Sequence, residues 1–208
     1  MVSFPANRVL TYETLADEIR CKIDGDLPFV LLGESFSGPL ALRLAADHPN
    51  ELIGVVLVAT FIRPPVPGWL RYLPWNAIFC FRAPLYILRV LLTGSRDAAV
   101  ILRRTSRIIR NVQPRVLASR VCSVLTVDAR TWLRSCPVPI LYLAASHDRL
   151  VRRHCLDEIL THRHDVIQRC IPSPHFLLQL APTEAWTAIS DFVAEAGKTR
   201  VDGGGGDA

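Results

Sequence analysis

Three residues of this chain have the types and surroundings that nucleophilic chemistry requires. Ser35 follows the apolar run FVLLG in the turn GESFSG, Asp148 closely follows PILYLAAS, and His175 closely follows VIQRCIP. A serine hydroxyl becomes a nucleophile when an imidazole accepts its proton and a carboxylate fixes the imidazole tautomer. If the fold brings the three side chains together, the sequence predicts covalent catalysis at Ser35.

The elements that must position these residues alternate along the chain. Short apolar runs, typical of strands buried on both faces, predict strands at residues 29–33, 52–60, 137–146 and 166–172. Apolar residues at helical spacing predict helices at 11–23, 38–48, 152–161 and 183–197. This alternation predicts an α/β fold with a mainly parallel sheet, flanking helices and right-handed crossovers. The three residues would then share the carboxyl edge of the sheet, where ligands bind.

Two of the predicted helices carry further signals. Thr11 is a candidate N-cap for the helix at 11–23, whose apolar stripe is Leu15, Ile19 and Ile23. The closing helix is expected to turn one apolar face to the core, formed by Ala185, Trp186, Ile189, Phe192 and Val193.

Three segments of the chain resemble the α/β-hydrolase superfamily. They are LLGESFSGPLALRLAADHP, PVPILYLAASHDRLV and IPSPHFLLQLAPTEAWTAISDFV, and the order Ser, Asp, His is the order of that fold. The resemblance covers roughly residues 11–60 and 137–195. It implies that Ser35 is the nucleophile, His175 the base and Asp148 the residue that orients the base.

The resemblance also assigns roles within the turn that carries the serine. Gly33, Ser37 and Gly38 would be the small residues of the nucleophile elbow, with Ser37 standing where glycine is commonest. The backbone N–H of Phe36 would donate to the oxyanion. Glu34 stands where many relatives have histidine or tryptophan, and its side chain would lie near the elbow.

Other residues compete for these roles on the sequence alone. The competing bases are His147, His154, His162 and His164, of which the last three lie on or just after a predicted exposed helix. Asp157 and Asp165 compete with Asp148 but do not stand at a strand end. The six cysteines have no CxxC spacing or neighbouring base pattern, so we expect scattered buried thiols of a reducing compartment rather than a disulfide frame, a zinc site or a nucleophile. No metal or cofactor is expected.

Residues 61–136 interrupt the alternation and are expected to form a helical lid over one end of the sheet. The stretch from Arg63 to Arg134 holds thirteen arginines and two acidic residues. This surface is either simply solvated or attracts an acidic partner, such as an acyl carrier protein, a CoA thioester or an anionic membrane surface. Its apolar residues would suit a lipophilic or acyl substrate: Trp69, Leu73, Trp75, Ile78, Phe79, Phe81, Leu85 and Ile87. Nucleic-acid binding is not expected, because no binding motif is present.

The predicted core comprises residues 1–60 and 137–197, and residues 198–208 are expected to form a flexible tail. We expect a cytoplasmic protein, since residues 1–20 lack the features of a signal peptide and charged residues interrupt the most apolar stretch, 73–92.

The predicted strand order differs from the family plan in one respect. Members of the fold have several strands before the nucleophile, and a loop with an HG-type motif usually supplies a second oxyanion donor. This sequence contains no HG pair, and only residues 1–5 resemble part of an earlier strand. The strand at 29–33 would then become a sheet edge, unless residues 1–10 pair with it. Three explanations of this difference are open: a misassigned start, a shortened relative, or direct pairing of residues 1–10 with this strand. We favour a truncated or misassigned start.

The sequence thus favours a serine hydrolase that cleaves a carboxylic ester or thioester through an acyl-Ser35 intermediate. The alternative is a non-catalytic relative that binds an acidic partner through the arginine-rich insertion. Haloalkane or epoxide cleavage ranks lowest, because those families usually place an aspartate where Ser35 stands.

Overall fold

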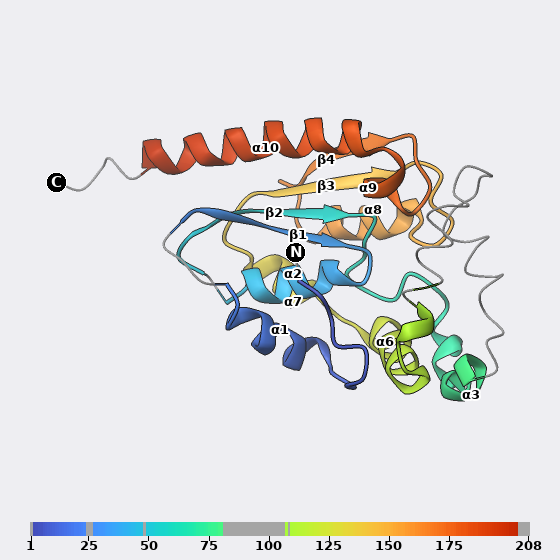
Figure 1. Cartoon of the computed structure of the whole chain (residues 1–208). Coiled ribbons are helices and arrows are strands. Elements are labelled where there is room, and N and C mark those ends of the chain that lie inside the picture. The colour runs from blue at the N-terminus through green and yellow to red at the C-terminus, as the bar shows by residue number, and fades with distance from the viewer. Residues whose placement is uncertain (1, 24–26, 48, 81–106, 108, 204–208) are drawn as a thin grey trace.

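The computed structural model of the chain describes residues 2–23, 27–47, 49–80, 107 and 109–203. Its strands are β1 (Phe29–Glu34), β2 (Leu52–Val58), β3 (Ile140–Ala145) and β4 (Ile167–Ile171). They pair in the order β1-β2-β3-β4, and every pair is parallel. The predicted parallel sheet is therefore confirmed, and the four carboxyl ends point to one side of the molecule (Figure 1).

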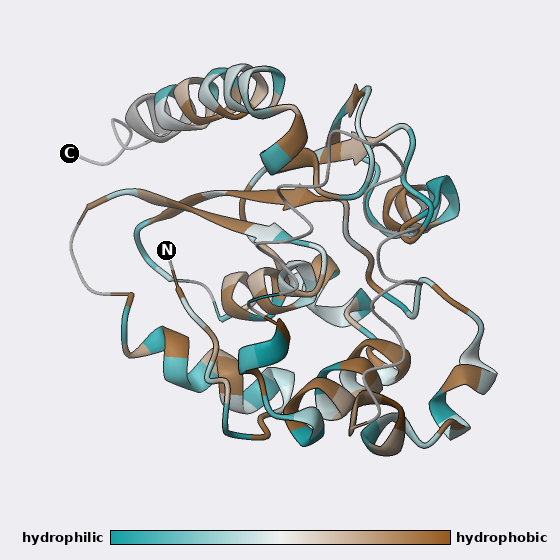
Figure 2. Cartoon of the chain, turned by 45° about the vertical axis from the view of Figure 1, so that its right-hand side comes forward, coloured by the Kyte–Doolittle hydropathy of each residue, from teal (hydrophilic) through white to brown (hydrophobic). Residues whose placement is uncertain are grey.

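Helices cover both faces of this sheet (Figure 1). Helix α10 (Pro182–Gly203) lies across one face. The opposite face carries α1 (Tyr12–Arg20), α2 (Ser37–Ala45), α7 (Arg130–Ser135) and α8 (Arg153–His162). Figure 2 shows strands that are hydrophobic along most of their length between helices with mixed faces. This distribution is expected for strands covered by helices on both sides.

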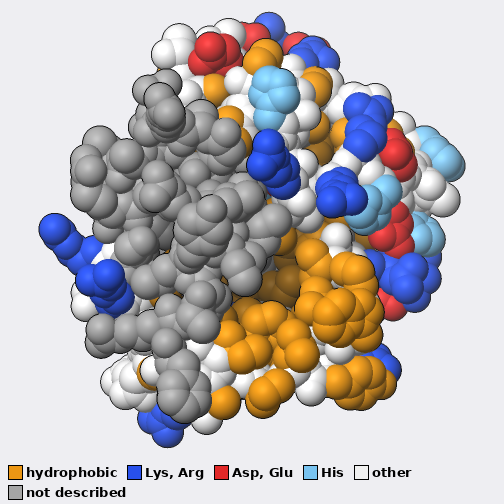
Figure 3. Space-filling model, turned by 90° about the vertical axis from the view of Figure 1, so that its right-hand side faces the viewer, with side chains coloured by type: hydrophobic (Ala, Val, Ile, Leu, Met, Phe, Trp, Pro, Cys, Tyr) orange, Lys and Arg blue, Asp and Glu red, His pale blue; other side chains and the backbone are white. Residues whose placement is uncertain are grey.

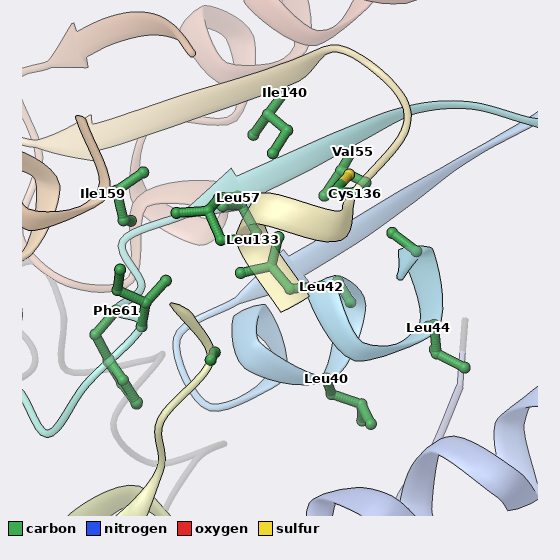
Figure 4. Packing of buried hydrophobic residues seen from close by; sticks show 14 of the residues in the cluster. Leu40, Leu42, Leu44, Val55, Leu57, Phe61, Leu133, Cys136, Ile140 and Ile159 are labelled. Atoms are coloured by element: carbon green, nitrogen blue, oxygen red, sulfur yellow. The ribbon is translucent and has the colours of Figure 1, made fainter. Parts of the chain in front are cut away.

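The larger core lies between the sheet and the helices of the α2 face. Figure 4 shows Leu42 of α2, Val55 and Leu57 of β2, Ile140 of β3 and Leu133 of α7 in one cluster. All five side chains are fully buried, and burying each contributes on the order of 1.5–3 kcal/mol. The core therefore fixes α2 against the sheet, and α2 begins directly after the turn that carries Ser35.

Helix α1 begins as its sequence predicts. Thr11 is the N-cap, and its hydroxyl accepts the backbone N–H of Thr14 while the Thr14 hydroxyl accepts the N–H of Thr11. This reciprocal capping box satisfies two of the backbone donors that a helix start leaves free. Leu15 and Ile19 are buried, as the apolar stripe requires.

Strand β1 forms one edge of the sheet within the described residues, as its sequence predicted. It pairs only with β2, and residues 2–11 form no strand beside it. Helix α10 packs chiefly against β2, with further contacts to β3 and β4. Leu32 of β1 is consequently 44% exposed. A run of residues typical of a central strand thus occupies an edge position.

The arginine-rich insertion is described in part. It contains η1 (Gly68–Tyr72), α3 (Trp75–Cys80), α6 (Pro114–Thr126) and α7, and both η1 and α3 pack against α6. Figure 1 places α3 and α6 toward the side to which the strands point. Helix α7 instead belongs to the core through Leu133. Phe81, Leu85 and Ile87, expected on the apolar side of the lid, lie outside the described residues.

Several expectations about the C-terminal part and the cysteines were wrong. Trp186 is 70% exposed, because α10 turns Ala185 and Phe192 to the sheet and leaves Trp186 on its outer side. The closing helix also continues to Gly203, beyond its predicted end at residue 197, while residues 204–208 lie outside the described residues. Four of the six cysteines are exposed: Cys21, Cys80, Cys122 and Cys170. Cys170 is exposed because β4 forms the other sheet edge.

Candidate active site

The turn after β1 holds Ser35 in a strained backbone conformation. Its φ is 52°, in the left-handed region that few non-glycine residues adopt. The backbone N–H of Ser35 donates to the carbonyl of Val58 at 2.9 Å, and the Ser35 carbonyl accepts the N–H of Gly38 at 3.1 Å. It also accepts the hydroxyl of Thr60 at 2.6 Å. These bonds from β2, the loop after it and the start of α2 maintain the strained turn.

The small residues of the predicted elbow have specific steric reasons to be small. A Cβ on Gly33 would lie 2.5 Å from the Ser37 carbonyl oxygen, and one on Gly38 would lie 2.0 Å from the Thr60 Oγ1. Ser37 fits because its hydroxyl donates to the Glu34 carbonyl at 2.8 Å and closes the turn. Glycine is therefore required at positions 33 and 38, whereas serine at 37 is compatible with the turn.

The structure brings Ser35, His175 and Asp148 into one hydrogen-bonded chain. The Ser35 Oγ lies 2.8 Å from the His175 Nε2, and the His175 Nδ1 lies 2.7 Å from the Asp148 Oδ2. The histidine and aspartate side chains are each 2% exposed. With a proton on Nδ1 donated to the carboxylate, Nε2 is free to accept the serine proton.

The remaining oxygen of Asp148 is held by its own loop. The Oδ1 accepts the backbone N–H groups of Leu150 and Val151, each at 2.8 Å. The side chain is thereby fixed with Oδ2 turned toward the imidazole.

The loops that carry Asp148 and His175 are joined to each other. After β3, the N–H of Ser146 donates to the carbonyl of Ile171, and the N–H of His147 donates to the carbonyl of Ser173, both at 3.0 Å. After His175, the short helix α9 (Leu177–Leu180) buries Leu177 against the α10 face of the sheet. These contacts extend the parallel pairing of β3 and β4 into the site.

Glu34 lies beside the elbow and contacts the segment that follows His175. One carboxylate oxygen accepts the side-chain amide of Gln179 at 2.9 Å, and the other lies 3.5 Å from the backbone N of Leu178. Burial raises the pKa of Glu34 above its usual value, while the bonds from Gln179 and Leu178 act in the opposite direction. The sequence placed Glu34 near the elbow but not these partners, because the four-residue helix α9 has no periodic signal of its own.

Phe36, the predicted oxyanion donor, is held by an aromatic cluster. The Tyr12 ring stacks on the Phe36 ring at 4.9 Å between centroids, and the Tyr12 hydroxyl donates to the Phe36 carbonyl at 3.1 Å. Phe4 meets Phe36 edge-on at 5.8 Å. Tyr12 and Thr60 were not predicted as neighbours of the elbow, since nothing in their local spacing distinguishes them from core residues.

The competing residues lie in other surroundings. His147, His154 and His164 are exposed, and His162 is half-buried at the end of α8. Asp157 pairs with Arg153 and Asp165 with Arg163, each at 3.0 Å. Burial raises the pKa of the Cys155 thiol to about 12 and also raises that of Cys136, which keeps both protonated.

The face at the carboxyl edge of the sheet combines apolar and basic side chains. Figure 3 looks onto the side where α3 and α9 lie in Figure 1 and shows hydrophobic side chains gathered beside several basic ones. Trp69 and Tyr72 of η1 are 63% and 75% exposed. Among the residues that the structure describes, no three His, Cys, Asp or Glu side chains are grouped as metal ligands would be. None of the described helices is both long and apolar enough to cross a bilayer.

The parallel sheet, its flanking helices and the strained turn that carries Ser35 after β1 define the class of protein as an α/β hydrolase. The sequence model of the serine aminopeptidase S33 family matches residues 9–166, which is more than half of the chain. The protein belongs to this hydrolase family. The matched stretch includes Ser35 and Asp148 and ends before His175.

Solved structures show the same fold at low sequence identity. A hydrolase from Pseudomonas aeruginosa PA01 superposes with a TM-score of 0.77 at 18% identity, covering 92% of this chain and 74% of its own. A thermophilic esterase from Thermogutta terrifontis superposes with a TM-score of 0.68 at 20% sequence identity, and the match covers 91% of this chain and 74% of the esterase. A structure from a study of carboxylesterases of Nitrososphaera gargenis superposes with a TM-score of 0.70 at 16% sequence identity, and the match covers 92% of this chain and 74% of the other. No curated protein sequence matches the chain.

Proposed function

We propose that this hydrolase cleaves a carboxylic ester or thioester through an acyl intermediate on Ser35. The observation that carries the proposal is the hydrogen-bonded chain from Ser35 through His175 to Asp148, with distances of 2.8 and 2.7 Å. Each member has the partner that its role requires, and the side chains of His175 and Asp148 are almost fully buried. This is the arrangement by which a serine hydroxyl is made nucleophilic.

The proposed reaction proceeds in two halves. The Ser35 Oγ attacks the ester carbonyl and passes its proton to the His175 Nε2, while Asp148 stabilises the resulting imidazolium. The oxyanion accepts a hydrogen bond from the Phe36 N–H. Collapse of this intermediate leaves the acyl group on Ser35, and His175 protonates the departing alcohol or thiol. Water, deprotonated by His175, then attacks the acyl-enzyme and releases the acid and free Ser35.

The surroundings of the site support a small substrate with an apolar part. Trp69 and Tyr72 expose large aromatic surfaces on η1, within the part of the chain expected to cover the carboxyl edge. Three of the structural neighbours described above carry the words hydrolase, esterase or carboxylesterases in their descriptions. The combination favours a lipophilic ester over a highly charged substrate.

The binding of an acidic partner by the arginine-rich insertion remains a prediction. Five of its thirteen arginines lie between residues 81 and 106, outside the described part of the chain. We therefore rest the proposed function on the Ser35 site alone.

Turnover of p-nitrophenyl butyrate and octanoate tests the proposal, with an alanyl p-nitroanilide to detect amide cleavage of the kind the family's name indicates. The parent should hydrolyse the esters, and Ser35→Ala should lose the activity. Ser135→Ala is the matched control, because Ser135 is exposed at the end of α7 and should leave the rate unchanged. Ester turnover that survives Ser35→Ala would contradict the acyl-Ser35 mechanism.

A further inference from the structure

We infer that Thr60 is a positioning residue that orients the oxyanion donor of the neighbouring Phe36, an inference that rests on the proposed function. Thr60 follows β2 and is a fully buried polar residue. Its hydroxyl donates to the Ser35 carbonyl at 2.6 Å, the shortest bond that the structure gives this carbonyl. None of the proposed chemical steps uses this buried hydroxyl, which calls for another role.

The role follows from the geometry of one peptide unit. The carbonyl of Ser35 and the N–H of Phe36 belong to the same planar trans peptide, so they point in opposite directions from it. A hydroxyl that holds the carbonyl therefore also sets the direction of the N–H. A hydrogen bond accepted by the carbonyl further polarises the amide and strengthens its N–H as a donor. Thr60 thus acts on the oxyanion through Phe36 without touching the substrate.

Thr60 is itself fixed by the neighbouring strand. The Tyr142 hydroxyl of β3 donates to the Thr60 carbonyl at 2.7 Å and accepts the Thr60 N–H at 3.2 Å. Burial raises the pKa of Tyr142, which keeps the phenol protonated and able to donate. The β-branched threonine side chain has few rotamers, so a fixed backbone also aims its hydroxyl.

Backbone strain is concentrated at both ends of this contact. Among the described residues, Ser35 and Ala59 are the two non-glycine residues with positive φ, at 52° and 42°. Ala59 directly precedes Thr60 and is held by the Leu143 carbonyl at 3.0 Å. Strained residues persist where the surrounding structure fixes them, and they gather at functional sites. The two strained turns face each other across the bond between Thr60 and Ser35.

Gly38 completes the arrangement by leaving room for the threonine. A Cβ at this position would lie 2.0 Å from the Thr60 Oγ1. The Gly38 N–H also donates to the Ser35 carbonyl at 3.1 Å, so this carbonyl keeps a donor when the hydroxyl is removed. A variant that lacks only the hydroxyl should therefore keep the elbow and lose its exact orientation.

The test compares Thr60→Val, which keeps the shape, with Thr60→Ser, which keeps the donor. Removing an oxyanion donor costs about 10²–10³ in kcat, and a misaligned donor less, so we expect kcat of Thr60→Val to fall about tenfold at unchanged KM. Thr60→Ser should stay within about twofold of the parent. Thr187→Val on α10 is the matched control, since among the described residues the Thr187 hydroxyl donates within its own helix, to the Thr183 carbonyl.

A tetrahedral inhibitor separates this role from simple packing. Trifluoroacetophenone forms a hemiketal when the Ser35 Oγ bonds to its ketone carbon and the proton moves to His175, and the new oxyanion faces Phe36. The affinity of the protein for trifluoroacetophenone should fall in Thr60→Val by the same factor as kcat/KM. Thr60→Ser should keep the parental values of both quantities. Equal losses in the valine and serine variants, or an active Thr60→Val with parental kcat, would overturn the inference. A parent that neither hydrolyses esters nor binds the ketone would instead overturn the proposed function itself, and the inference with it.

Discussion

Replacement of Asp148 by asparagine should abolish most of the activity while it leaves the loop in place. The Asp148 Oδ1 accepts two backbone N–H groups at 2.8 Å, and an asparagine carbonyl oxygen can take over that position. The amide NH2 then replaces Oδ2, 2.7 Å from the His175 Nδ1. Facing a donor, Nδ1 must become an acceptor, and the imidazole proton moves to Nε2. The nitrogen next to the Ser35 Oγ can then no longer accept a proton.

This tautomer change sets the expected magnitude. Where the same exchange traps the wrong tautomer in a serine triad, kcat falls by about 10⁴, and we expect a similar loss here with little change in KM. The assay is p-nitrophenyl butyrate turnover, with thermal unfolding to establish that Asp148→Asn is folded. Asp157→Asn is the matched control, because Asp157 is an exposed carboxylate paired with Arg153, and its kcat should equal that of the parent. A folded Asp148→Asn variant within about tenfold of the parental kcat would refute the assignment of Asp148.

Two further changes test the surroundings of the serine. The raised pKa of Glu34 means that its folded carboxyl binds a proton more tightly than the unfolded one, whose value is near 4.5. The Glu34 carboxyl therefore lowers the stability of the fold as pH rises from 4.5 through its folded pKa. Glu34→Gln should remove this decline, which is measured as Tm against pH. An identical pH slope of Tm in both proteins would contradict the burial of Glu34 as its cause. Gly38→Ala should destabilise the fold by more than about 2 kcal/mol in urea unfolding, because its Cβ meets the Thr60 hydroxyl. Gly197→Ala is the control, because a Cβ at this position meets no atom within 4 Å, and it should stabilise the fold by about 0.5–1 kcal/mol. Equal effects of the two changes would contradict the steric explanation.

The sequence allowed the sheet and the residues at its carboxyl edge to be predicted because both depend on local patterns. Apolar runs such as FVLLG predict strands, and the positions of Ser35, Asp148 and His175 after such runs place them on separate loops at the carboxyl edge of the sheet. The edge position of β1 within the described residues was also among the expected outcomes, because residues 1–10 carry only a partial strand signal.

The contacts that refine the site depend on tertiary packing and left no local signal. Thr60 reaches Ser35 only because β2 and β1 lie side by side and Ala59 turns the chain at the strand end. Gln179 meets Glu34 through a four-residue helix, too short to show a hydrophobic period. The exposure of Trp186 shows the opposite case, in which helical spacing suggested a wider buried face than α10 presents to the sheet.

Covalent labelling of the folded protein by a fluorophosphonate, mapped by mass spectrometry, shows whether Ser35 is an activated nucleophile. Such a probe phosphonylates a serine only where a neighbouring base has made it nucleophilic. We expect a single adduct on Ser35, formed slowly or not at all when His175 is replaced by glutamine. Absence of an adduct on the folded parent, or an adduct on another serine that persists in Ser35→Ala, would contradict this expectation.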